Sequence, residues 1–120
     1  MQVILIAVAG AAGALSRYGV GNAVGGRSFP WATLGINLTG SFALGLLLHL
    51  ARLRGWPDDV TLPIAVGFLG AFTTFSTFSV ETFDLLRTDR ALEAAVYVGL
   101  SVIGGLAAAA LGYAVARSFA

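Results

Sequence analysis

Cysteine and lysine are both missing from this 120-residue chain, and histidine occurs once, as His49. Without cysteine, the protein has no disulfide, no thiolate metal site and no thiol nucleophile. The single histidine forms no nucleophile–base pair with the residues around it in the sequence. The sequence therefore predicts a protein that is not an enzyme.

Charged residues are scarce as well. They make up 11% of the chain, whereas a typical soluble domain has about 25%. Hydrophobic residues make up 58%, and the mean hydropathy is +0.87. The formal net charge is only +1, so no basic surface indicates a nucleic-acid partner. This composition predicts a multi-pass protein of the cell membrane, surrounded by lipid.

Four hydrophobic runs account for most of the chain, at residues 3–24, 31–50, 61–86 and 92–115. Each is long enough to cross a bilayer, which takes about 20 helical residues. The expected fold is a single all-α domain of four transmembrane helices. One copy of so short a chain encloses little space, so we expect a pore or cavity to need an oligomer.

The arginines are divided evenly between the two predicted sides of the membrane. Arg52, Arg54 and Arg117 fall on the side of both termini, and Arg27, Arg87 and Arg90 fall on the other, to which Arg17 of the first crossing is nearer. Because the Lys/Arg imbalance sets orientation, an even division favours insertion in both directions. The sequence therefore predicts an antiparallel homodimer with its two-fold axis in the membrane plane.

The third run is a poor continuous helix at its centre, where residues 67–81 read GFLGAFTTFSTFSVE. Five of these residues are Ser or Thr, whose side chains compete for backbone hydrogen bonds. Gly67 and Gly70 each weaken a helix by about 1 kcal/mol relative to alanine. We therefore expect a broken membrane helix, which is tolerated only where protein buries it or water lines it.

A break of this kind provides groups that can bind a cation and groups that can bind an anion. Unwinding frees backbone carbonyls, among them that of Gly70, and hard cations bind oxygen ligands. The hydroxyls of Ser76 and Thr77 and the amide of Asn37 offer donors to a dehydrated anion. Several weak sites of this kind favour conduction over trapping.

Phenylalanine recurs at every third position, as Phe72, Phe75 and Phe78, so the three rings are expected near one side of the segment. An aromatic ring has a positive edge, which attracts an anion weakly. The alternative is ordinary packing against lipid or the core.

Three further polar residues have two interpretations each. Arg17 either reaches toward the interface or faces the entrance of an anion path. Asn37 either joins helices by hydrogen bonds or lines that path. Glu81 is either a solvated charge at a helix end or a carboxylate at the channel mouth.

Three segments of the sequence resemble the small bacterial fluoride channels of the Fluc or CrcB family. One is the 67–81 segment, and the others are 10–18, GAAGALSRY, and 30–42, PWATLGINLTGSF. Together they cover three of the four predicted helices in the right order and spacing. The resemblance implies a dual-topology homodimer that exports fluoride passively from the bacterial cytoplasm and reduces its toxicity.

The resemblance also implies roles for individual residues. A structural Na⁺ would be held at the dimer interface by the carbonyls of Gly70 and Thr73, and Phe75 and Phe78 would be the aromatic residues of the pathway. The other pathway residues implied by the resemblance are Thr33, Asn37, Ser76, Thr77, Glu81, Tyr97 and Ser101. Family members often have a further hydroxyl where this chain has Gly105.

Two other functions are compatible with a four-helix membrane protein of this size. A small multidrug–proton transporter needs a carboxylate in its first crossing, and residues 3–24 contain no Asp or Glu. A structural membrane subunit would not require an asparagine, a Ser/Thr cluster and three phenylalanines to converge. Liposome flux measurements distinguish these functions from fluoride conduction.

Overall fold

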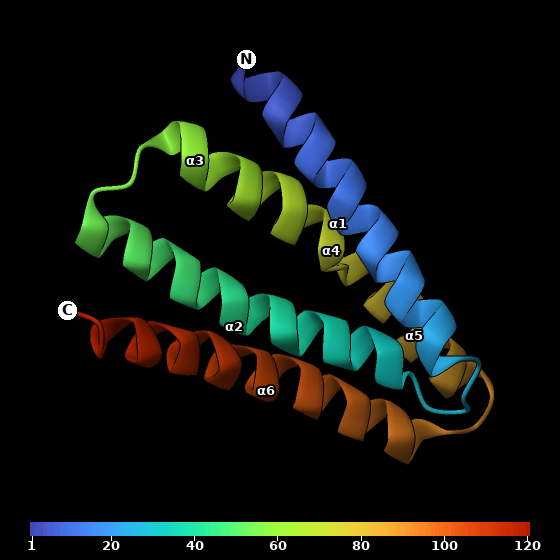
Figure 1. Cartoon of the computed structure of the whole chain (residues 1–120). Coiled ribbons are helices and arrows are strands. Elements are labelled where there is room, and N and C mark those ends of the chain that lie inside the picture. Colours follow the sequence, from blue (N-terminus) through green and yellow to red (C-terminus); the bar gives the residue numbers. More distant parts are fainter.

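The computed structural model describes all of residues 1–120 and is entirely helical (Figure 1). Its elements are α1 (Gln2–Val24), α2 (Trp31–Arg54), α3 (Asp58–Leu62), η1 (Pro63–Leu69), α4 (Gly70–Phe72), α5 (Phe75–Arg87) and α6 (Ala91–Arg117). Elements α3 to α5 follow one another as a single interrupted crossing, so four segments are long and apolar enough to span a membrane. The expected all-α membrane fold with a broken third helix is confirmed.

The helices extend beyond several of the predicted limits. Helix α2 continues to Arg54 and stops at Gly55, which adopts the left-handed conformation that glycine tolerates best. The third crossing begins at Asp58, directly after Pro57. Glycine and proline thus determine where α2 ends and where the third crossing begins. The hydrophobic runs gave narrower limits, because they leave out the arginines and aspartates of the connection.

The four crossings form two closely packed pairs. Helix α2 packs along α6, and α1 packs along η1 and α4 (Figure 1). In the first pair, a Cβ at Gly112 would overlap the Phe42 carbonyl; in the second, a Cβ at Gly13 would overlap the Phe68 carbonyl. Packing in lipid depends on such backbone approach, because lipid supplies no hydrophobic driving force between helices.

The two pairs diverge toward the end of the molecule that holds the α2–α3 connection (Figure 1). Helix α5 crosses from the α1 side toward α6, which it contacts. Both termini lie toward the end with the α2–α3 connection, and the α1–α2 and α5–α6 connections lie at the other end. The break between α4 and α5 therefore lies in the middle of the bundle, where the pairs begin to separate.

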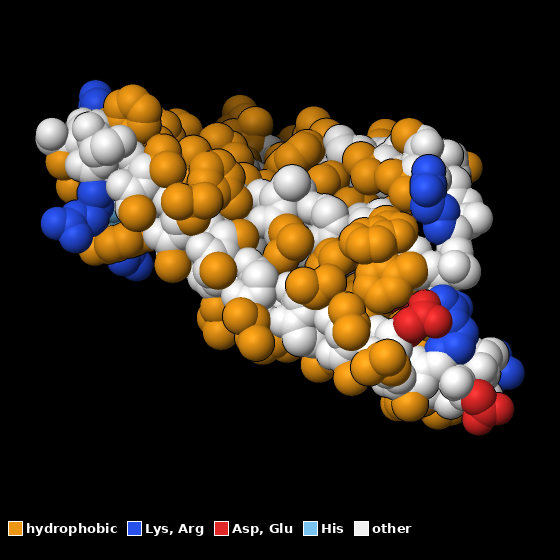
Figure 2. Space-filling view, turned by 90° about the horizontal axis from the view of Figure 1, so that it is seen from below, with side chains coloured by type: hydrophobic (Ala, Val, Ile, Leu, Met, Phe, Trp, Pro, Cys, Tyr) orange, Lys and Arg blue, Asp and Glu red, His pale blue; other side chains and the backbone are white.

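The face shown in Figure 2 carries many hydrophobic side chains, and its charged side chains gather at the two ends. Only 15 of 120 residues are buried within the chain, and Tyr97 is its one large side chain that is fully buried. Such a surface suits a protein whose apolar side chains face lipid or another protein chain.

We predict that Gly112→Ala destabilises the protein by about 1–3 kcal/mol, the usual cost of overpacking, because the new Cβ would meet the α2 backbone. The control is Gly99→Ala on the same helix, where nothing lies within 4 Å of an added Cβ. The measurement is the thermal unfolding midpoint in detergent. Equal midpoints for the two variants would contradict the packing described here.

Candidate ion pathway at the break in the third crossing

The break consists of Thr73 and Thr74, both with extended backbones. Their φ and ψ angles are −79° and 158° at Thr73, and −151° and 123° at Thr74. Thr74 is also the N-cap of α5, since its hydroxyl accepts a hydrogen bond from the Thr77 N–H at 3.2 Å. The chain thus leaves one helix at Thr73 and starts the next at Phe75.

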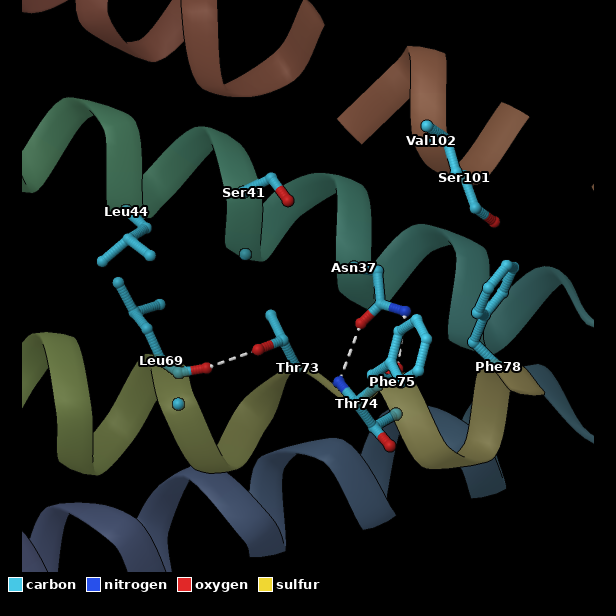
Figure 3. A pocket seen from close by; sticks show the side chains of 12 residues that line it. Asn37, Ser41, Leu44, Leu69, Thr73, Thr74, Phe75, Phe78, Ser101 and Val102 are labelled. Atoms are coloured by element: carbon cyan, nitrogen blue, oxygen red, sulfur yellow. Dashed lines mark hydrogen bonds between the residues drawn. The ribbon is translucent and has the colours of Figure 1, made fainter. Parts of the chain in front are cut away.

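Asn37 of α2 replaces the backbone hydrogen bonds that Thr74 loses in the break (Figure 3). Its Nδ2 donates to the Thr74 carbonyl at 2.9 Å, and its Oδ1 accepts from the Thr74 N–H at 2.9 Å. Unpaired backbone groups at this depth would be costly, so the amide stabilises the extended conformation. Asn37 therefore joins two helices, and one N–H of its amide remains free for another partner.

Two carbonyls are left without donors by this arrangement. In a continuous helix, the Gly70 carbonyl would accept from the Thr74 N–H, and the Thr73 carbonyl from the Thr77 N–H. Both donors bond elsewhere, to Asn37 Oδ1 and to the Thr74 hydroxyl. None of the side-chain hydrogen bonds, and none of the backbone hydrogen bonds outside the regular helices, reaches either carbonyl.

Arg17 of α1 lies beside the same break. Its Nε donates to the Ala71 carbonyl at 3.1 Å, so the guanidinium satisfies one of the carbonyls at the end of α4. Arg17 thus contacts the end of a helix, a position where a positive charge is favourable.

A cavity of about 300 Å³ lies between the break and helices α2 and α6 (Figure 3). Six of the predicted site residues line it: Asn37, Gly70, Thr73, Phe75, Phe78 and Ser101. The Ser101 hydroxyl is the one buried side-chain polar atom without a hydrogen-bond partner. Buried polar groups are nearly always paired, so this hydroxyl is available to a ligand or water.

The phenylalanines do not act as a triplet. Phe75 and Phe78 lie on α5 with ring centroids 5.8 Å apart, whereas Phe72 stacks on Phe68 at 5.9 Å. Phe72 precedes the extended residues and Phe75 and Phe78 follow them, so the expectation that all three lie near one side stays a prediction. Phe75 is 79% exposed within the single chain.

A second polar group is centred on Glu81. Its carboxylate accepts from the Thr33 hydroxyl at 2.6 Å and from the Tyr97 hydroxyl at 3.1 Å, and thus links α5 to α2 and α6. The oxygens of Glu81 are therefore shared with two neutral donors, and the carboxylate is not simply a solvated charge at a helix end.

A second cavity, of about 440 Å³, lies between α1, α2 and α5. Four predicted residues line this cavity: Arg17, Thr33, Thr77 and Glu81. The predicted site residues thus fall on two sides of α5. Ser76 lines neither cavity; its hydroxyl lies 3.4 Å from that of Thr74.

Thr74 was not singled out from the sequence, although it forms the break and caps α5. The available signal was a threonine three residues before Thr77, the spacing of a helix N-cap. Gly105 has room for a larger side chain, since an added Cβ would lie 3.8 Å from the Ser41 hydroxyl oxygen. Ser41 lines the first cavity, so α2 supplies a hydroxyl near this position.

The comparisons with known proteins cover nearly the whole chain. The profile of the family described as CrcB-like protein, Camphor Resistance (CrcB), matches residues 4–113. The chain belongs to the CrcB-like family. The sequence is 46% identical to a protein of Hahella chejuensis named fluoride-specific ion channel FluC, over 97% of this chain and 94% of the relative.

Other CrcB-like relatives give the same result. The chain is 46% identical to a FluC protein of Magnetococcus marinus over 98% of both chains. It is 47% identical to FluC 1 of Symbiobacterium thermophilum over 95% of this chain and 96% of the relative. Both relatives are named as fluoride-specific ion channels. With four spanning helices and these bacterial relatives, this CrcB-like chain is a multi-pass bacterial membrane protein.

We predict that Asn37→Ala destabilises the protein by about 1–3 kcal/mol, because it leaves both Thr74 backbone groups unpaired. The control is Asn22→Ala, which removes an exposed amide without such bonds. Thermal unfolding in detergent gives the stability difference, and hydrogen exchange at Thr74 localises it. Unchanged exchange at Thr74 would show that Asn37 does not hold the break.

Proposed function

We propose that this protein is a fluoride channel that lets cytoplasmic fluoride leave passively down its electrochemical gradient. The observation that carries the proposal is the near full-length match to proteins named fluoride-specific ion channels. The break in the third crossing supports it, since irregular backbone at membrane depth is retained where it lines a path or a buried site. Such a channel would reduce fluoride toxicity, because neutral HF enters cells and ionises there.

The first cavity offers weak, separate contacts to a dehydrated anion. The free N–H of Asn37 and the unpaired Ser101 hydroxyl are donors from α2 and α6. Phe75 and Phe78 offer ring edges, whose partial positive charge attracts an anion without binding it tightly. A channel needs this combination, because an ion must enter each site and also leave it.

We further propose that two copies assemble as an antiparallel homodimer. Six of the seven arginines lie toward the ends of the bundle, three at each end, and the seventh, Arg17, lies beside the break, so neither orientation has a clear advantage. The cavity beside the break is open in the single chain, and both Gly70 and the Phe75 ring are exposed there. A second copy would cover these groups and enclose a pathway that one chain leaves open.

A structural Na⁺ at the dimer interface fits the chemistry of the break. The carbonyls of Gly70 and Thr73 lose their usual helical donors at the break, and two copies would contribute four such oxygens. Hard cations bind oxygen ligands, and no cluster of His, Asp or Glu in the chain competes as a metal site. The ion would supply a fixed positive charge that links the two broken helices.

The function is tested by fluoride efflux from proteoliposomes. Liposomes that contain the protein should release fluoride with a matching electrical current, and the same liposomes loaded with chloride should retain it. A drug–proton exchanger would instead move a cationic substrate against protons, and a structural subunit would move neither. Absence of fluoride efflux from correctly assembled protein would refute the proposed function.

We predict that Phe75→Ile and Phe78→Ile each slow fluoride efflux by about tenfold, because isoleucine removes the polarised ring edge. The matched control is Phe83→Ile, which changes a 62% exposed ring on the same helix, away from both cavities. Size-exclusion chromatography would verify that the variants still assemble. Wild-type efflux rates in both pathway variants would reject the aromatic assignment.

A further inference from the structure

Five aromatic side chains form a continuous series from the break to the end of the bundle. Ring centroids are 5.8 Å apart for Phe75 and Phe78, 5.1 Å for Phe78 and Tyr97, 5.6 Å for Tyr97 and Phe29, and 4.6 Å for Phe29 and Trp31. The proposed pathway uses the inner members of this series. Phe29 connects these inner members to Trp31.

Tyr97 is fixed by contacts on two sides of its ring. Phe78 meets it at an interplanar angle of 60° and Phe29 at 75°, so both pairs have the edge-to-face geometry that aromatic rings favour. The Tyr97 ring is fully buried, and its hydroxyl donates to Glu81. A change at Phe29 therefore affects the residue that contacts both Phe78 and Glu81.

Phe29 is itself held in place by the connection between α1 and α2. Pro30 restricts the backbone of the residue before it. On the other side, the Ser28 carbonyl accepts a hydrogen bond from Arg90 Nη1 at 2.7 Å, which ties the connection to the start of α6. The Arg90 guanidinium also pairs with Glu93 and so keeps its position.

Phe29 also lies at a mouth of the protein. A third cavity, of about 430 Å³, is formed by the α1–α2 connection and the ends of α2 and α5. Phe29 lines this cavity together with Thr33 and Glu81, and these last two residues also line the second cavity. The ring therefore stands where the cavity at the end of the bundle meets the polar group around Glu81.

We propose that Phe29 is a positioning residue of the fluoride pathway. From the mouth side, its ring holds Tyr97 in the orientation that keeps Phe78 and Glu81 in place. The aromatic character of Phe29 is what matters, because the contact with Tyr97 is an edge contact between rings as well as a packing contact. This inference rests on the proposed fluoride channel function.

The test compares Phe29→Met and Phe29→Leu, which keep an apolar side chain, with Phe29→Tyr, which keeps the ring. Fluoride efflux from proteoliposomes should be about fivefold slower in the Met and Leu variants, the scale expected for loss of one aromatic pair, and close to wild type in the Tyr variant. Phe119→Met, at an exposed residue near the C-terminus, controls for general effects of a Phe→Met substitution and of reconstitution. Unfolding midpoints and size-exclusion profiles identify variants that have kept their structure.

The outcomes separate this inference from the proposed function. If the wild-type protein releases no fluoride, the channel function fails. If the wild type conducts and Phe29→Met or Phe29→Leu, correctly assembled, conducts equally fast, the role of Phe29 is refuted. Equal slowing in the Met, Leu and Tyr variants would also refute it, because the effect would then reflect side-chain fit and not the aromatic ring.

Discussion

Two hydrogen bonds between one side chain and the backbone of one residue underlie the whole arrangement. The amide of Asn37 donates to and accepts from the backbone of Thr74, in place of the helical bonds that this residue lacks. In hydrocarbon, an extended residue without such partners would leave its N–H and C=O unsatisfied at a cost of several kcal/mol. The amide on α2 thus makes it possible for the third crossing to stay broken in the middle of the membrane.

The break affects the groups proposed to contact a cation and those proposed to contact an anion. Because Thr74 and Thr77 direct their N–H groups to side-chain oxygens, the carbonyls of Gly70 and Thr73 lose their helical donors, and these are the oxygens that would bind the proposed cation. The new helix that starts at Phe75 contacts α6, and its Phe78 ring meets Tyr97 there. The carbonyls of the proposed cation site, the aromatic series and the cavity therefore all adjoin one local irregularity.

Much of this architecture is predictable from the sequence. Hydropathy and length identified the four crossings, and the density of Ser, Thr and Gly in 67–81 indicated the break. The position of the break was not predictable, because it depends on Asn37 of another helix. For the same reason the sequence left the contact of Arg17 with Ala71 undetermined. The predicted dimer, cation and residue roles stay predictions, since each concerns a second copy or a bound ion.

The Thr73–Thr74 pair is the only place in the chain where one threonine follows another. Protein labelled with carbonyl-¹³C and ¹⁵N threonine therefore gives one directly bonded ¹³C–¹⁵N signal in solid-state NMR of lipid samples. We expect an extended-backbone carbonyl shift for Thr73, and a change in that shift when Na⁺ is replaced by a large organic cation. A helical shift that is indifferent to the cation would contradict this expectation.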